Sequence, residues 1–179
     1  MLKGQTFMDH AELAKKVSQI ASLTGKFTLR SGIVSDRYFD KYRFEGDPVL
    51  LREVAKGMLK LIPSDTEILA GLELGGVPIA TAMSLESGLP VAFVRKEAKT
   101  YGTCQAIEGQ VVKDRKVCFV EDVITTGGAV ADALELSRAD GANVLAVVCA
   151  IWRGEGAPHI KKAQDLDVRP LFTREDLEG

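Results

Sequence analysis

Histidine and cysteine are scarce in this sequence, and their scarcity limits its chemistry. The chain has two histidines, His10 and His159, and three widely spaced cysteines, Cys104, Cys118 and Cys149. This set is too small and too scattered for a zinc site, and it offers no disulfide framework and no Cys–His or Ser–His–Asp catalytic group. Because Cys118 and Cys149 lie in apolar runs, we expect both to be small core residues of a protein from a reducing compartment.

The sequence also lacks an excess of charge of one sign and any long apolar run. It has 23 basic and 25 acidic residues, closely mixed, with a formal net charge of −2. This balance gives no indication of binding to nucleic acid or to an anionic membrane. No apolar run approaches the roughly 20 residues of a membrane-spanning helix, and no signal-peptide pattern is present. We therefore expect a cytoplasmic protein with no nucleic-acid and no membrane partner.

Internal repeats, linkers and low-complexity tracts are absent, as are the dinucleotide fingerprint Gly-x-Gly-x-x-Gly and a P-loop lysine after glycines. What the sequence has is 46% hydrophobic residues and a regular alternation of strand and helix patterns. This composition fits a single domain, residues 1–179, with a sizeable core. The alternation predicts an α/β fold with a mostly parallel central sheet, helices on both faces and ligands at the carboxyl ends of the strands.

The expected elements follow from apolar periodicity and from residues that favour helix ends. Asp9 caps a first helix that ends at Gly25, and Asp47 caps a second that begins at Pro48 and ends before Pro63. Further helices are expected over 78–86, 128–140 and 160–164, and strands over 27–30, 37–41, 67–71, 91–95, 117–120, 142–152 and 168–172.

The most informative stretch runs from Val117 to Ala129. A buried strand leads into Glu121 and Asp122, and these lead into a loop at residues 125–128 that is rich in Thr and Gly and opens a helix. Free N–H groups at a helix start form an anion site, and glycines let a phosphate approach the backbone. Two acids at the end of a buried strand need partners such as sugar hydroxyls, a metal's water shell or a developing cation. The alternative is an ordinary strand–turn–helix that happens to contain two acids.

This whole stretch resembles the signature of the type I phosphoribosyltransferases. In that family the acidic pair holds the ribose 2′- and 3′-hydroxyls of phosphoribosyl pyrophosphate (PRPP), and the loop that follows holds its 5′-phosphate. The resemblance does not identify the base that is modified. It implies that PRPP is bound by Glu121, Asp122, Val123, Ile124, Thr125, Thr126, Gly127, Gly128 and Ala129.

A second segment, residues 27–41, is expected to form two short strands joined around Ser31-Gly32. It could be a plain edge hairpin with a solvated Arg30. The segment is similar to the amino-terminal hood of orotate phosphoribosyltransferases, which implies that Arg30 approaches the ligand and that Tyr38 and Phe39 enclose the base. An apolar slot with a few fixed polar groups suits a planar, carboxylated pyrimidine. The resemblance implies a hood formed by about residues 1–45 with the C-terminal segment.

Gly75 and Gly76 lie at a strand-to-helix turn. Such a turn admits a pyrophosphate against bare backbone, or the glycines serve only to make the turn tight. In the family this is the pyrophosphate loop, so the resemblance implies that both residues contact PRPP. Some relatives carry a lysine where Gly75 stands.

The stretch from about residue 96 to residue 115 shows neither the helical nor the strand period of apolar residues. A loop of this length in a compact domain is usually a lid or disordered. Arg95, Lys96 and Lys99 cluster at its start. The segment is similar to the family's mobile catalytic loop, which reaches across a homodimer interface into the partner's site. The resemblance implies that these three cations and Tyr101 bind PRPP, and that the cations act in catalysis with Asp122. Tyr101 stands where many relatives have histidine, although a phenol can also donate a hydrogen bond.

Arg153 follows the strand at 142–152 and lies among glycines. It is placed either for bidentate capture of a carboxylate or as an exposed loop residue. In orotate enzymes the matching arginine binds orotate, with help from the residue at Thr125. The resemblance therefore implies a pentosyltransferase that joins orotate to the phosphoribosyl group of PRPP, giving orotidine 5′-monophosphate and pyrophosphate in pyrimidine biosynthesis. It also implies Mg²⁺ carried by PRPP without direct protein ligands, Asp122 being in contact through water.

Two other functions fit the sequence less well. A purine-specific phosphoribosyltransferase fits poorly with the hood segment and with Arg153. A ligand-sensing regulator of the same fold would bind DNA through an added basic segment, which the mild negative charge and the short ends do not favour.

Overall fold

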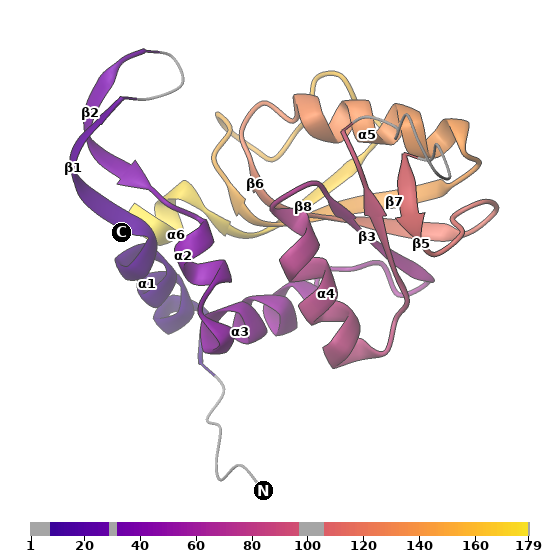
Figure 1. Cartoon of the computed structure of the whole chain (residues 1–179), viewed down its shortest axis with the longest axis horizontal. Helices are drawn as coiled ribbons and strands as arrows, with labels where there is room; N and C mark the ends of the chain where they lie inside the picture. The colour runs from indigo at the N-terminus through magenta and orange to yellow at the C-terminus, as the bar shows by residue number, and fades with distance from the viewer. Residues whose placement is uncertain (1–7, 29–31, 97–105, 179) are drawn as a thin grey trace, which may run out of the picture.

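The computed structural model describes residues 8–28, 32–96 and 106–178. Within them a six-stranded sheet forms the centre of the molecule, and a separate two-stranded hairpin stands beside it (Figure 1). The sheet order is β5-β4-β3-β6-β7-β8, and only β5 runs antiparallel to its neighbour. The predicted α/β fold with a mostly parallel sheet is confirmed. The strands are β3 (Ile68–Leu72), β4 (Val91–Val94), β5 (Ile107–Gly109), β6 (Lys116–Ile124), β7 (Asn143–Trp152) and β8 (Asp167–Thr173).

Helices cover both faces of the sheet. The central strand β6 shows this, because its alternate side chains are buried in two separate cores. Cys118 and Val120 pack with α1 (His10–Ala21), α3 (Pro48–Leu59) and α4 (Gly76–Ser87). Val117 and Phe119 pack with α5 (Gly128–Ala139) on the opposite face, as Figure 1 shows. Cys118 and Cys149 are fully buried, as expected for core residues. Among the described helices, none combines the length and the apolar character needed to cross a bilayer.

The hairpin consists of β1 (Ser22–Thr28) and β2 (Val34–Phe39), which pair antiparallel, followed by the short α2 (Tyr42–Glu45). It rises from α1, whose start is capped as predicted: the Asp9 Oδ1 accepts a hydrogen bond from Glu12 N at 2.7 Å. The C-terminal α6 (Arg174–Glu178) lies against α1, where Ser18 Oγ donates to the Leu177 carbonyl at 2.8 Å. The C-terminal helix therefore packs along α1, whose last turn leads into the hairpin.

Three expectations about the elements need correction, and two short helices were missed. The first helix ends at Ala21 rather than Gly25, because the chain passes directly into β1 and Gly25 lies at an irregularity of the β1–β2 pairing. No helix forms at 160–164, where the chain makes a turn through the bond from Ala163 N to the Ile160 carbonyl and buries both side chains in the core. The stretch 96–115 is not free of regular structure, since β5 pairs with β4. The short helices α2 and α6 were not predicted because neither has an apolar period of its own.

The sheet has a topological switch point between β3 and β6. From β3 the chain continues through α4 to β4 on one side, and from β6 it continues through α5 to β7 on the other. In open α/β sheets, ligands bind at the carboxyl ends of the strands at such a point. The loop that contains Gly75 follows β3 and the loop at residues 125–128 follows β6, so both lie at this end of the sheet.

Candidate functional site

The glycine loop after β3 lies in very close contact with β6. A Cβ atom added to Gly75 would come within 1.6 Å of Asp122 Oδ2, and one added to Gly76 would come within 2.1 Å of the Val120 carbonyl oxygen. The two glycines therefore let the start of α4 pack against the acidic end of β6. Any larger residue at either position would collide with β6, so both positions require glycine for space as well as for a tight turn.

The acid pair of β6 is buried. Glu121 is 8% exposed and Asp122 is 1% exposed, and as neighbours on a strand their side chains leave on opposite faces. Asp122 N donates to Glu121 Oε1 at 2.9 Å, and Val123 N donates to Asp122 Oδ1. Burial, followed by the hydrogen bond and the charge of Asp122, raises the pKa of Glu121 well above its ordinary value. Donors such as sugar hydroxyls would stabilise both carboxylates.

Two residues that the sequence did not single out complete this acidic cluster. The Lys41 ammonium, from the segment between β2 and α2, forms an ion pair with Asp122. Burial lowers the pKa of Lys41, but the hydrogen bond and charge of Asp122 outweigh it and raise that pKa overall. Glu45 on α2 is 6% exposed, and burial, followed by the charge of Asp122, raises its pKa to about 8. Within α2 itself, the one sequence feature that suggests burial is the apolar Phe44 next to Glu45, and Phe44 is fully buried.

The loop between β6 and α5 leaves the start of α5 open. Gly127 is the residue before the helix, and it has φ of +73° and no side chain to cap the first turn. A Cβ added to it would lie 2.5 Å from Ile160 Cγ1, so this position requires glycine for space as well as for backbone conformation. At Gly128 an added Cβ would meet nothing closer than 3.9 Å, and Thr125 and Thr126 are exposed. The first-turn N–H groups are thus available to an anion.

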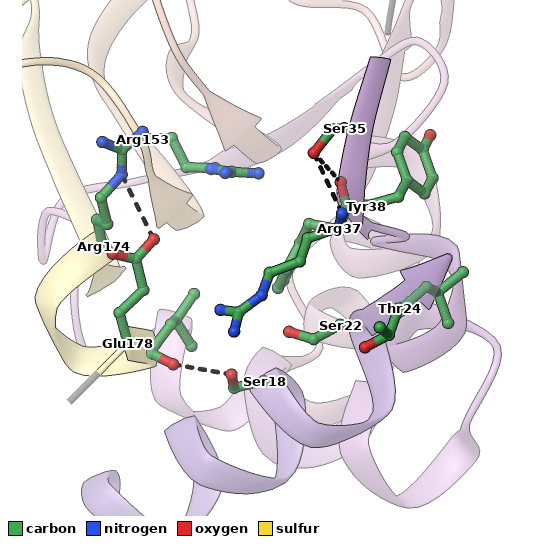
Figure 2. A pocket seen from close by; sticks show the side chains of 12 residues that line it. Ser18, Ser22, Thr24, Ser35, Arg37, Tyr38, Arg153, Arg174 and Glu178 are labelled. Atoms are coloured by element: carbon green, nitrogen blue, oxygen red, sulfur yellow. Dashed lines mark hydrogen bonds and ion pairs between the residues drawn. The ribbon is translucent and has the colours of Figure 1, made fainter. Parts of the chain in front are cut away.

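Arg153 is held at the end of β7 beside the end of β6, since its N–H donates to the Ile124 carbonyl at 2.8 Å. Its guanidinium carbon lies 5.4 Å from the centroid of the Phe39 ring. Both residues line a cavity of about 800 Å³ between the hairpin, α1 and α6. Figure 2 shows Arg153 and Arg37 reaching into this cavity from opposite sides. Arg174 also lines it and pairs with Glu178 at 3.7 Å, as the dashed line in Figure 2 marks.

Tyr38 and Phe39, which were predicted to enclose the base together, are successive residues of β2, so their side chains point to opposite faces of that strand. Phe39 lies on the side of Arg153, whereas the Tyr38 ring turns away from Arg153 in Figure 2 and lies 5.4 Å from the Phe27 ring. Tyr38 is among the cavity residues but is 45% exposed. Arg37, which no sequence pattern indicated as a site residue, shares the side of Phe39 because it is two residues away on the same strand.

The start of the segment after β4 is tied to the glycine loop. Lys96 N donates to Glu73 Oε2 at 3.2 Å, and Glu73 N donates to the Val94 carbonyl at 2.9 Å. Arg95 N donates to the Ala106 carbonyl at 2.8 Å, which joins the two described ends of this segment. Arg95 and Lys96 therefore leave the sheet next to the loop that contains Gly75. Arg30, Lys99, Tyr101 and Cys104 lie outside the described residues.

Comparisons with known proteins agree on one family. Residues 48–170 match the phosphoribosyl transferase domain. The orotate phosphoribosyltransferase of a Nocardioides species is 52% identical over 169 residues, which cover 94% of each chain. The crystal structure of Mycobacterium tuberculosis orotate phosphoribosyltransferase with Fe(III) dicitrate is 32% identical, with a TM-score of 0.82 over 95% of this chain and 99% of that one. A structure of the same enzyme in complex with PRPP has a TM-score of 0.81 at 29% identity, covering 96% of this chain and 100% of that one.

The acid pair on β6, the uncapped start of α5 and the arginine beyond β7 thus lie in the chain region that the domain match covers. The 52% identity with the Nocardioides enzyme is measured over nearly the whole of both chains. The chain therefore belongs to the orotate phosphoribosyltransferase family.

Proposed function

We propose that this chain transfers the 5-phosphoribosyl group of PRPP to N1 of orotate, forming orotidine 5′-monophosphate and releasing pyrophosphate in pyrimidine biosynthesis. The observation that carries the proposal is the arrangement at the carboxyl ends of the neighbouring strands β6 and β7. The end of β6 carries a buried acid pair and leads to an open helix start, which suit a phosphorylated sugar, and β7 leads to Arg153, whose cavity beside Phe39 suits a flat anion. Sequence identity of 52% with an orotate phosphoribosyltransferase supports it.

The sugar phosphate would bind along β6 and the start of α5. The 5′-phosphate accepts hydrogen bonds from the backbone N–H groups of residues 125–129 and from the exposed hydroxyls of Thr125 and Thr126. The ribose hydroxyls donate to Glu121 and Asp122, whose oxygens keep acceptor capacity beyond the bonds from Asp122 N, Val123 N and Lys41. Val123 and Ile124 contribute backbone between the two subsites.

Orotate would bind in the cavity against Phe39. The Arg153 guanidinium offers two parallel N–H groups, which match a carboxylate, and the Phe39 ring offers an apolar face to the pyrimidine. Thr125 adds a hydroxyl beside the base, and Arg30 and Tyr38 are proposed to close the slot from the hood. Uracil lacks the carboxylate, so it would leave Arg153 without a partner.

The leaving group determines the rest of the mechanism. Breaking the bond from C1 to pyrophosphate builds negative charge on the pyrophosphate and an oxocarbenium-like charge on the sugar. Arg95, Lys96 and Lys99 are proposed to stabilise the pyrophosphate, with a hydrogen bond from Tyr101 and with backbone contacts from Gly75 and Gly76. Asp122 holds the ribose and favours positive charge on it. No side-chain nucleophile is needed, and catalysis rests on positioning and electrostatics.

The residues at this site suit Mg²⁺ that enters bound to PRPP. Within the described residues, no group of three or more His, Cys, Asp or Glu is arranged to hold a metal ion. The available side-chain donors at the site are the carboxylate oxygens of Glu121 and Asp122, which suit Mg²⁺ through its water shell. When bound with PRPP, Mg²⁺ supplies neutralisation of the pyrophosphate charge.

We further propose a cytoplasmic homodimer in which the segment of about 96–115 completes the partner's site. Since β5 ties residues 107–109 to β4 of their own chain, the crossing part would precede β5. The absence of a charge excess among the 23 basic and 25 acidic residues supports small-molecule substrates as the partners.

The test of the function is a spectrophotometric assay of orotate consumption with PRPP and Mg²⁺. Orotate should be consumed with stoichiometric release of pyrophosphate, whereas uracil, adenine and hypoxanthine should react far more slowly. Faster reaction of a purine or of uracil would contradict the proposal.

A further inference from the structure

An excess of buried acid surrounds the ribose-binding end of β6. Glu45, Glu121 and Asp122 are each no more than 8% exposed, and burial and mutual charge raise the pKa values of Glu45 and Glu121. Among the described residues, the one ion pair that these three carboxylates make is with Lys41. Buried like charges are costly unless a cation or hydrogen-bond donors compensate them, so Lys41 is central to the charge balance of this cluster.

The Lys41–Asp122 ion pair also connects the hood to the central sheet. Lys41 lies two residues after Phe39, which faces Arg153 in the base cavity, and directly before α2, which carries Glu45. Its ammonium reaches out of the hood and pairs with Asp122 of the central sheet. The Lys41 side chain is 31% exposed, whereas that of Asp122 is 1% exposed, so the hood supplies the cation and the sheet supplies the buried anion.

Within the hood, the β1–β2 hairpin is attached to α1 and stands apart from the six-stranded sheet. Asp40 N donates to the Ala21 carbonyl at 2.8 Å, and the strands β1 and β2 pair with each other and not with the six-stranded sheet. Figure 1 shows the hairpin standing clear of the sheet above α1. The Lys41–Asp122 pair and the Arg153–Phe39 contact therefore both link the hood to the carboxyl ends of β6 and β7.

We propose that Lys41 is a positioning residue that fastens the base-binding hood to the ribose-binding acid Asp122, so that occupation of the ribose pocket and binding of the base strengthen each other. The proposal rests on the proposed function for the identity of the two ligands. Ribose hydroxyls that donate to Asp122 fix the carboxylate that Lys41 pairs with. A fixed Asp122 in turn fixes Lys41 and, two residues away, Phe39. A coupling of this kind is reciprocal by thermodynamic necessity.

The experiment measures the affinity for orotate by calorimetry, with and without saturating ribose 5-phosphate, which fills the sugar-phosphate pocket but cannot react. In the wild-type chain ribose 5-phosphate should tighten orotate binding by about fivefold or more, the lower end of typical couplings. In Lys41→Met the factor should fall to about one, and Lys41→Arg should recover most of it. Lys16→Met is the matched control, since it removes an exposed Lys16–Glu12 pair on α1 at 2.8 Å and should keep the wild-type factor.

A second measurement needs no orotate and guards against misfolding. Ribose 5-phosphate should slow hydrogen–deuterium exchange of residues 34–45 in the wild type and leave it unchanged in Lys41→Met. If Lys41→Met does not fold, Lys41→Met/Glu45→Gln, which removes one of the unpaired acids, replaces it in both measurements. The proposal is overturned if the wild type shows no coupling, or if the Lys41 variant keeps the wild-type factor and exchange pattern. Failure of the proposed function would show separately, as a wild-type chain that does not consume orotate.

Discussion

Replacing Arg153 by alanine is the sharpest test of how this site selects its base. The guanidinium of Arg153 stands in the cavity beside Phe39, and its backbone is anchored to β6 through the 2.8 Å bond to Ile124. Arg153→Ala should therefore remove the carboxylate contact without moving the loop. Charge-assisted hydrogen bonds of this kind contribute about 1.5–3 kcal/mol, which corresponds to roughly a ten- to a hundredfold change in affinity.

The expected result is specific to one substrate. The KM for orotate should rise by roughly ten- to a hundredfold, whereas the KM for PRPP should change little, because the sugar phosphate binds along β6 and α5. The ratio of kcat/KM for orotate to that for uracil should shrink by a similar factor, because the unpaired guanidinium that penalises uracil is gone. Steady-state kinetics on both bases at saturating PRPP measure all three quantities.

Arg174→Ala provides the control for charge alone. Arg174 lines the same cavity but already pairs with Glu178, and its side chain is 57% exposed. Its loss should change the KM for orotate by far less than that of Arg153. If Arg153→Ala keeps the preference for orotate over uracil, the carboxylate is bound elsewhere. Arg37 on the opposite wall of the cavity is then the next candidate, followed by Arg30.

The sheet and the phosphate-binding stretch were predictable because their signals are local. The run from Val117 to Phe119 is apolar without interruption, and the structure buries it on both faces. Gly88 and Gly141 follow the helices predicted over 78–86 and 128–140, and both have positive φ, of +78° and +83°, as is typical of residues that end helices. Asp47 accepts hydrogen bonds from Val49 N and Leu50 N in the cap that its sequence indicated. Each of these features depends on residues within a few positions of one another.

The acidic cluster could not be predicted, because it is assembled from distant segments. Lys41 and Asp122 are 81 positions apart, and no local pattern distinguishes Lys41 from a solvated lysine. Glu45 lies in a four-residue helix whose burial depends on α1 and α3 packing around Phe44. Likewise the need for glycine at position 75 arises from Asp122, which approaches it only in the folded chain. Tertiary contacts of this kind leave no periodic trace in the sequence.

Three further predictions test the loop, the dimer and the buried acid. Lys99→Ala should lower turnover about a hundredfold and leave the dissociation constant for PRPP nearly unchanged; unchanged turnover would remove Lys99 from the mechanism. Inactive Lys99→Ala and inactive Asp122→Ala chains, mixed under conditions of verified subunit exchange, should regain activity, because one site of a mixed dimer has both residues; no recovery would mean that each chain completes its own site. The third concerns Glu45, whose pKa is raised from 4.5 to about 8 by burial and by the charge of Asp122. Between these values the folded chain binds more protons than the unfolded chain, so this group makes the free energy of unfolding fall as pH rises. Glu45→Gln has no proton to lose and should flatten that fall between pH 5 and pH 8 in urea titrations. An equal slope in the variant and the wild type would show that Glu45 ionises normally in the folded protein.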